Sequence, residues 1–215
     1  MSLLTTEFIL SAAQTIQQTI VANEQTLESL DREIGDGDHY INMKRGASVI
    51  AEMQTELQAL TPDAALHKIG MKLLSTIGGA SGPLLASFFM SMAKVLKENG
   101  DDSHLKIAAA FAAGVEAIRQ RGKADIGEKT MLDVLIPVSH QFTLLAAQNC
   151  DVKLICATLI NTAEQGMLAT KDLIATKGRA AGLGERAIGH IDPGAKSCQL
   201  MIETVCNLVL KESNL

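Results

Sequence analysis

The chain has 215 residues, 47% of them hydrophobic, which is enough to fill a sizeable core. Only 3% are aromatic, with no Trp and one Tyr, whereas Ala, Leu, Ile and Met are plentiful, a composition that favours packed helices over a β-sandwich. The net charge is -5, and no run of Lys and Arg could follow a nucleic-acid backbone. We therefore expect an all-α protein that does not bind nucleic acid directly.

The start of the chain and the spacing of the cysteines indicate the cellular compartment of the protein. Residues 5–7 are Thr-Thr-Glu, unlike the cationic start of a signal peptide, and no uncharged apolar stretch approaches the roughly 18 residues of a membrane span. We expect a soluble, cytoplasmic protein with no membrane partner. Cys150, Cys156, Cys198 and Cys206 have spacings that match neither a CxxC redox pair nor a zinc site. They are interpreted as buried packing residues.

Apolar residues recur at intervals of three and four along the chain, the period of a helix with one buried face. The first such run lies within residues 5–22. Two later helix starts carry capping signals, a Thr61 hydroxyl before Pro62 and an Asp192 carboxylate before Pro193. No strand is needed, and further helices are predicted at residues 24–33, 42–58, 62–76, 82–98, 103–120, 130–148, 151–175 and 193–211.

Polar, glycine-rich segments separate the predicted helices at residues 34–41, 77–82, 121–129 and 176–192. No repeat, low-complexity tract or Pro/Ser-rich linker divides the chain, so we expect one domain over residues 1–215. A helical bundle brings the loops at one of its ends together. Residues far apart in the sequence are therefore expected to build one site there.

The segment Leu30–His39 ends a predicted helix and enters a turn with two glycines. Asp31, Asp36 and Asp38 place three carboxylates there, and adjacent anions are unfavourable unless a cation compensates. The spacing does not fit an EF-hand, so Mg²⁺ completed by phosphate oxygens is the better match for these hard donors. A solvated turn explains the same residues equally well. His39 could be a metal ligand, a hydrogen-bond donor to phosphate or a surface residue, and the sequence favours none of these.

Two other segments each allow two interpretations. Residues 78–83 precede an apolar helix, so backbone N–H groups and the Ser81 hydroxyl can bind an anion at its N-terminus, although a tight interhelical turn is the simpler explanation. Residues 121–133 lead into a helix start. There Met131 either packs on a nucleotide base or belongs to the core, with Lys129 facing solvent in the second case.

The longest polar segment covers residues 177–194 and carries Lys177, Arg179, Arg186 and His190. It either folds over bound phosphates, for which the planar fork of Arg offers bidentate donors, or forms a mobile surface loop. Several such loops at one end of a bundle favour a binding site over a set of unrelated turns.

Together these motifs resemble the L-subunit family of bacterial dihydroxyacetone kinases (DhaL) and the corresponding domain of ATP-dependent dihydroxyacetone kinases. The motifs occur in order over nearly the whole chain. They are Leu30–Met43, Gly78–Pro83, Gly127–Asp133, Lys177–Arg179 and Gly184–Gly194.

The resemblance implies an antiparallel eight-helix barrel with an adenine nucleotide, ADP or ATP, at one end. It implies two Mg²⁺ ions held by Asp31, Asp36 and Asp38 and bridged by phosphates, and no catalytic nucleophile in this chain. The nucleotide is expected to be surrounded by His39, Tyr40, Ile41, Asn42, Ala80, Ser81, Gly122, Met131, Arg179, Asp192, Pro193 and Gly194.

For the phosphotransferase-system form of this family, the resemblance implies that bound ADP is rephosphorylated by a phosphohistidine-bearing partner, DhaM. The resulting ATP then phosphorylates dihydroxyacetone on a separate subunit, DhaK. The alternatives are an ATP-dependent kinase subunit for another short ketose and a regulatory protein whose nucleotide state is read by a transcription activator. Tyr40, Leu85–Ala86 and Ala181–Gly182 depart from the family pattern, which leaves the sugar and the partner surface open.

Overall fold

The computed structural model describes residues 4–98 and 103–213, and these residues contain α-helices and 3-10 helices but no strand. The expected all-α class is confirmed. Eight of the helices have between 14 and 20 residues. They are α1 (Thr6–Ala22), α3 (His39–Glu52), α5 (Pro62–Thr76), α6 (Ser81–Lys97), α7 (His104–Gly122), α8 (Leu132–Ala147), α9 (Val152–Ala169) and α10 (Pro193–Glu212). The shorter elements are α2 (Glu24–Ile34), α4 (Gln54–Leu57) and the 3-10 helices η1 (Thr170–Asp172) and η2 (Arg179–Ala187).

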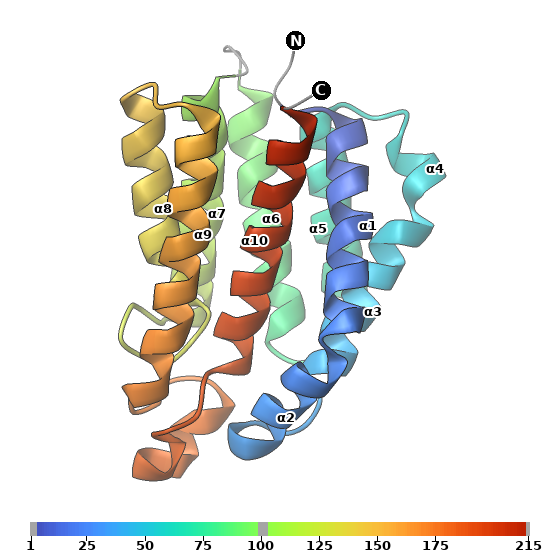
Figure 1. Cartoon of the computed structure of the whole chain (residues 1–215). Helices are drawn as coiled ribbons and strands as arrows, with labels where there is room; N and C mark the ends of the chain where they lie inside the picture. Colours follow the sequence, from blue (N-terminus) through green and yellow to red (C-terminus); the bar gives the residue numbers. More distant parts are fainter. Residues whose placement is uncertain (1–3, 99–102, 214–215) are drawn as a thin grey trace.

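The eight long helices form a closed antiparallel ring (Figure 1). Each packs against the next one in the chain, and α10 returns to pack against α1. This closure confirms the expected eight-helix barrel. The barrel follows from the hydrophobic period, because every long helix buries a stripe of apolar side chains against both neighbours.

Two large apolar clusters hold the two halves of the barrel together. One joins α7 to α10 and includes Leu132 and Val138. The other joins α1, α4, α5 and α6 and includes Leu57 and Leu73. Complete burial of one such side chain stabilises the fold by roughly 1.5–3 kcal/mol relative to its exposure. Of the cysteines, Cys156, Cys198 and Cys206 are buried packing residues as expected, whereas Cys150 is partly exposed.

Two predicted helices differ from the structure by more than two residues at an end. The helix expected at residues 42–58 begins earlier, at His39, and is interrupted at Met53, whose side chain is buried in the core. The helix expected at residues 151–175 ends at Ala169. The 3-10 helix η1 follows directly, and in it the carbonyl of Thr170 accepts a hydrogen bond from the Lys129 ammonium, while the Thr170 hydroxyl donates to Met167 O (2.6 Å).

The two capping signals mark true helix starts. Asp192 caps α10, since its carboxylate accepts a hydrogen bond from Ala195 N–H at 2.7 Å. Pro62 begins α5 as predicted, but the Thr61 side chain forms no cap hydrogen bond, so this part of the expectation was wrong. Pro62 itself sets the start, because its ring fixes a helical φ and removes one N–H that would lack a partner.

The connections after α2, α5, α7 and α9 all lie at the same end of the barrel, the lower end in Figure 1. They are the four glycine-rich segments that the sequence singled out. The helix ends Thr6 and Glu212 lie at the opposite end. Within the described residues, no helix is both long and apolar enough to cross a membrane.

Candidate functional site

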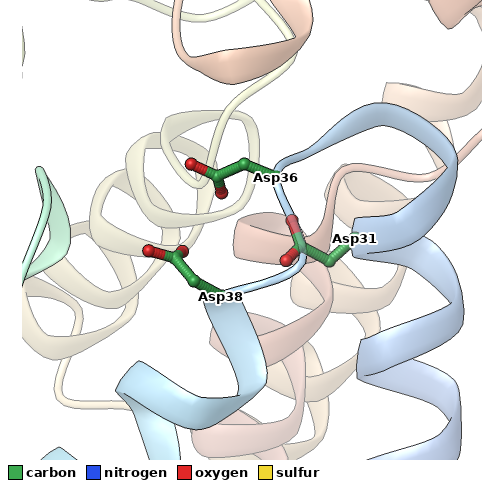
Figure 2. A group of neighbouring side chains, drawn as sticks. All are labelled: Asp31, Asp36 and Asp38. Carbon is green, nitrogen blue, oxygen red and sulfur yellow. The ribbon is translucent and has the colours of Figure 1, made fainter.

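The acidic loop, residues 31–38, brings three carboxylates together (Figure 2). Asp31 lies in the last turn of α2, whereas Asp36 and Asp38 lie in the turn before α3. One carboxylate oxygen from each residue lies within 4.8 Å of the others. Asp31 is buried, and Asp36 and Asp38 are exposed. The loop therefore presents an anionic cluster that is anchored on one side and open on the other.

Gly35 allows the Asp31 carboxylate to lie against the backbone. A Cβ atom on Gly35 would lie 1.8 Å from Asp31 Oδ1, so no other residue type fits without moving the carboxylate. Gly37 has a φ of +80°, which side chains disfavour, and a Cβ there meets no atom within 4 Å. The two glycines thus serve the loop in different ways, one by close approach and one by backbone conformation.

A chain of hydrogen bonds links the acidic loop to α10. Asp31 Oδ2 accepts a hydrogen bond from the His39 backbone N–H (2.9 Å). His39 Nε2 lies 3.0 Å from Ser197 Oγ, and the Ser197 hydroxyl donates to Gly194 O (3.1 Å). Which of the two groups donates depends on the tautomer of the His39 ring. Burial lowers the pKa of His39, and Asp31 and Asp38 oppose this effect. His39 therefore links the acidic loop to α10.

A second segment, residues 171–189, lies over the acidic loop, and we call it the covering segment. Arg179 Nε lies 2.8 Å from Asp36 Oδ2 in an exposed ion pair. Ala180, Ala187 and Leu183 pack against Ile34 at the end of α2. Apolar packing and one ion pair thus place the covering segment beside the carboxylates. This contact agrees with the sequence-based interpretation in which the segment folds over a site.

The connection between α5 and α6 lies next to the start of α3. A Cβ on Gly78 would lie 3.9 Å from Asn42 Oδ1. A Cβ on Gly82 would lie 2.3 Å from the Ile77 carbonyl, so this tight turn requires glycine there. Ala80 is the N-cap of α6 and forms no side-chain cap hydrogen bond, and Ser81 is the first helical residue. The first backbone N–H groups of α6 therefore lack an intrahelical partner, as an anion site at a helix start requires.

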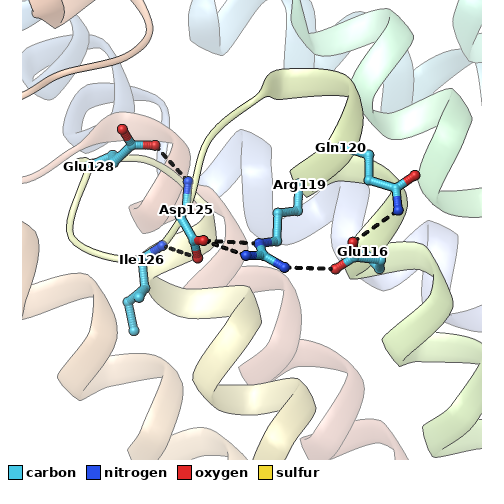
Figure 3. Close-up of polar contacts among 6 residues, drawn as sticks. All are labelled: Glu116, Arg119, Gln120, Asp125, Ile126 and Glu128. Atoms are coloured by element: carbon cyan, nitrogen blue, oxygen red, sulfur yellow. Dashed lines mark hydrogen bonds and ion pairs between the residues drawn. The ribbon is translucent and has the colours of Figure 1, made fainter.

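The connection between α7 and α8 is held by an exposed polar network (Figure 3). Arg119 donates to Asp125 Oδ2 from Nε (3.1 Å) and from Nη2 (2.6 Å). Its Nη1 lies 3.4 Å from Glu116 Oε2. Asp125 accepts from Ile126 N–H and donates its own backbone N–H to Glu128. The Arg119 hydrogen bond lowers the pKa of the Asp125 carboxyl. These contacts fix the path of the chain from Gly122 toward α8.

Gly122 and Met131, in the connection between α7 and α8, lie close to the starts of α6 and α10. A Cβ on Gly122 would lie 3.4 Å from a methyl group of Leu84 in the first turn of α6. A Cβ on Gly194 would lie 3.7 Å from both Cβ and Cε of Met131. Met131 is partly buried and also packs on the α7–α10 core. It therefore belongs to the core on one side and borders residues 192–194 on the other.

Tyr40 and Ile41, both expected near a nucleotide, point in different directions. The Tyr40 side chain is buried among Ile20, Leu27 and Leu200, and its hydroxyl has no hydrogen-bond partner. Ile41 is 51% exposed. Only the backbone of Tyr40, in the first turn of α3, is therefore placed for a role at the site.

Sequence reasoning missed the polar residues that connect the loops. Lys129, expected to face solvent if Met131 were core, is only 1% exposed, and its Nζ donates to the carbonyls of Thr170 and His190. Asp133 is also buried and accepts from Gly127 N–H (2.5 Å) and Thr130 N–H (2.7 Å). Thr130 followed three residues later by Asp133 is a capping-box pattern, so that signal was present in the sequence.

The acidic loop suits a divalent cation with oxygen ligands. Two oxygens bound to one Mg²⁺ lie at most about 4.2 Å apart, so carboxylates within 4.8 Å of one another need only a small closure. One Asp31 oxygen is committed to His39, and one Asp36 oxygen to Arg179. The remaining carboxylate oxygens can bind metal, and the open side leaves positions for phosphate or water. The residues present therefore fit Mg²⁺.

Comparisons with known proteins agree with this arrangement. Residues 33–207 match the DAK2 domain family. The chain is 40% identical over 191 residues to the ADP-binding subunit DhaL of PEP-dependent dihydroxyacetone kinase 1 from Listeria innocua, covering 87% of this chain and 89% of that protein. It is 39% identical over 186 residues to the Escherichia coli K12 ADP-binding subunit DhaL, covering 86% and 88%.

Longer proteins contain a similar region. Mouse triokinase/FMN cyclase is 30% identical over 192 residues, which cover 89% of this chain and 33% of that protein. The crystal structure of the C. freundii dihydroxyacetone kinase in complex with AMP-PNP and Mg²⁺ has the same fold, with a TM-score of 0.72 and 24% identity. That match covers 93% of this chain and 33% of the other. On the extent of these matches, the chain belongs to the DAK2 domain family.

Proposed function

We propose that this chain is the ADP-binding subunit of a dihydroxyacetone kinase, a single nucleotide-binding domain that acts as a phosphotransferase only with partner subunits. The observation that carries the proposal is the convergence of Asp31, Asp36 and Asp38 at the barrel end where four glycine-rich loops meet. The identity of 39–40% to DhaL subunits over most of both chains supports the same conclusion.

In this proposal the acidic loop holds two Mg²⁺ ions, which neutralise phosphate charge when bound. The starts of α3 and α6 direct backbone N–H groups toward the same region, from Tyr40 and Ile41 and from Ser81. Arg179 provides a guanidinium that can exchange Asp36 for a phosphate oxygen. The chain's own contribution is therefore to align the nucleotide and compensate its charge, which is the main requirement of phosphoryl transfer.

The base and ribose lie, in this proposal, near Gly122, Met131 and residues 192–194. Met131 and Gly194 border one another across the starts of α8 and α10, and Gly122 borders Leu84 at the start of α6. Met131 offers a polarizable apolar surface on which a purine can pack. Asn42 and Ala80 belong to the adjoining turns of α3 and α6, so the expected nucleotide residues lie around one end of the barrel.

The phosphate is proposed to come from a phosphohistidine-bearing DhaM-type partner and to pass through bound ADP to dihydroxyacetone on a DhaK-type subunit. A gel-filtration and turnover experiment tests this. Purified chain should retain ADP in Mg²⁺, lose it in EDTA, and restore turnover when added to DhaK-type and DhaM-type subunits with phosphoenolpyruvate.

Other outcomes of this experiment identify the alternatives. Rapid nucleotide exchange and turnover driven by free ATP with a DhaK-type subunit alone would indicate an ATP-dependent kinase subunit instead. ADP retention with no turnover in any combination would point to a regulatory protein read by a partner such as a transcription activator. Failure to bind nucleotide in Mg²⁺ would contradict the proposal altogether.

A further inference from the structure

Lys129 is a buried cation at a position where the sequence favours exposure. Its backbone adopts a left-handed conformation with a φ of 59°, and its side chain is 1% exposed. Burying an ammonium group is unfavourable unless hydrogen bonds and opposite charges compensate it. Lys129 therefore needs hydrogen-bond acceptors and nearby negative charge in the interior.

The Lys129 ammonium joins the two ends of the covering segment. It donates hydrogen bonds to the carbonyl of Thr170, which precedes the segment, and to the carbonyl of His190 (2.6 Å), which follows it. Two further hydrogen bonds join the same two ends: Gly189 N–H donates to Lys171 O (2.8 Å), and Asp192 N–H donates to Thr170 Oγ1 (3.1 Å). We call these joined ends, residues 170–171 and 189–192, the neck of the covering segment. One side chain from the α7–α8 connection thus holds both ends of a segment of about twenty residues.

Three aspartate side chains surround this neck. Burial lowers the pKa of Lys129, and Asp192, Asp133 and Asp172 oppose that effect. Asp133 also accepts hydrogen bonds from the backbone N–H groups of Gly127 and Thr130. The carboxylate that shapes the turn around Lys129 therefore also stabilises its positive charge.

The body of the covering segment has few restraints of its own. Gly178 and Gly184 have positive φ, and η2 is a 3-10 helix interrupted at Gly184. Its contacts with the rest of the protein include the small apolar cluster at Ile34, the Arg179–Asp36 pair and a hydrogen bond from Thr176 to Glu128 (2.9 Å). A segment with so few buried contacts opens easily, so its position depends on how firmly its ends are fixed.

We propose that Lys129 is a positioning residue that closes the neck of the covering segment and thereby holds Arg179 at the acidic loop. The inference rests on the proposed function, because it assigns Arg179 to a nucleotide phosphate. Lys129 acts through backbone carbonyls 41 and 61 residues away rather than through the acidic loop itself.

The test compares Lys129→Met with Lys171→Met, which removes an exposed lysine from the same neck. Hydrogen exchange without nucleotide should accelerate by roughly tenfold or more at the Gly189 and Asp192 amides in Lys129→Met, and stay unchanged in helices α1 and α6. Dissociation of Mg-ADP should accelerate on the order of tenfold, as expected for lost charge-assisted hydrogen bonds. Lys171→Met should match the wild type in both measurements.

A double-mutant cycle separates positioning from general loosening. If Lys129 acts through Arg179, Lys129→Met should add little to the ADP dissociation rate of Arg179→Ala. Fully additive rates, or unchanged exchange at the neck, would overturn the proposal. Should Lys129→Met not fold, Thr170→Val decides, since it removes the hydroxyl contacts with Met167 and Asp192 but keeps the carbonyl that Lys129 binds. Exchange at the Gly189 amide near the wild-type rate supports the proposal, and acceleration by roughly tenfold or more there overturns it, because the hydroxyl rather than Lys129 would then close the neck. If the wild type binds no Mg-ADP, the proposed function fails while the exchange measurement still decides whether Lys129 closes the neck.

Discussion

Arg179 Nε lies 2.8 Å from Asp36 Oδ2, so the covering segment places a cation directly on one of the three clustered carboxylates. The two side chains are 66% and 40% exposed, and ion pairs of this kind contribute little to stability. Mg²⁺ can therefore displace Arg179 from Asp36 at small cost, and the released guanidinium is then available for a phosphate. Metal binding and the placement of Arg179 are linked through this one carboxylate.

Asp36→Asn should remove Mg²⁺-dependent ADP binding, with affinity reduced at least about 100-fold, because an amide is a much poorer ligand for Mg²⁺ than a carboxylate. Titration calorimetry with ADP, in Mg²⁺ and in EDTA, measures the effect. Glu212→Gln, an exposed carboxylate at the other end of the barrel, serves as the matched control and should bind like the wild type. Unchanged affinity in Asp36→Asn would refute the metal assignment.

Gly35→Ala should weaken Mg²⁺ binding, because the new Cβ would lie 1.8 Å from Asp31 Oδ1 and must displace that carboxylate. Overpacking of this kind also destabilises the fold by about 1–3 kcal/mol. Gly37→Ala is the control, since its Cβ meets no atom within 4 Å and only the backbone strain of about 1–2 kcal/mol applies. Thermal unfolding with and without Mg²⁺ distinguishes them: Gly37→Ala should keep the Mg²⁺-induced rise in Tm, and Gly35→Ala should lose most of it. Equal rises in both variants would contradict the role given to Asp31.

Asp133→Asn should destabilise the protein by about 1–3 kcal/mol, because the new amide group would turn a hydrogen donor toward a backbone N–H of Gly127 or Thr130. Urea unfolding followed by circular dichroism measures the change. Glu185→Gln, an exposed residue at the same end of the barrel, should unfold like the wild type. A wild-type midpoint in Asp133→Asn would show that the capping box contributes little.

Burial raises the pKa of the Asp192 carboxyl to about 7, although the hydrogen bond from Ala195 N–H opposes the shift. Between about pH 4 and pH 7 the folded protein therefore holds a proton that the unfolded chain has released. The stability contributed by this proton is complete below pH 4 and falls as pH rises through 7, by at most about 1.4 kcal/mol per pH unit. Above pH 7 it no longer changes.

Asp192→Asn removes this titration. The free energy of unfolding of the wild type, relative to that of Asp192→Asn, should therefore decrease as pH rises from about 4 to about 7. Urea unfolding of both proteins over this range provides the comparison. A difference that is constant or grows with pH would mean that Asp192 is ionised in the folded protein throughout.

Local sequence patterns predicted the helices well where the decisive interactions are also local. Helix α5 has the predicted bounds of 62–76, because Pro62 fixes its start and its apolar period is regular. The three aspartates of the acidic loop were recognised because they lie within eight residues of one another. Such features require no knowledge of the rest of the fold.

Features that depend on distant residues could not be predicted in the same way. Lys129 is buried because two carbonyls, 41 and 61 residues further along the chain, accept hydrogen bonds from its ammonium group. The Thr170 carbonyl that Lys129 binds directly follows α9, which ends six residues before the predicted bound. Tyr40, one of the expected nucleotide residues, turns its side chain into the core because Ile20 and Leu200 from other helices surround it. In each case tertiary contacts override the local signal.

The closed ring also constrains how other proteins reach the site. Thr6 and Glu212 lie at the end of the barrel opposite the acidic loop, and the 20 residues of α10 separate the two ends by about 30 Å. A domain joined to either helix end must therefore extend along the whole barrel to touch the site, whereas an independent protein can approach the loops directly. Consequently, an affinity tag, a fluorophore or a surface tether at either helix end leaves the loop end of the barrel unobstructed for partner-binding measurements.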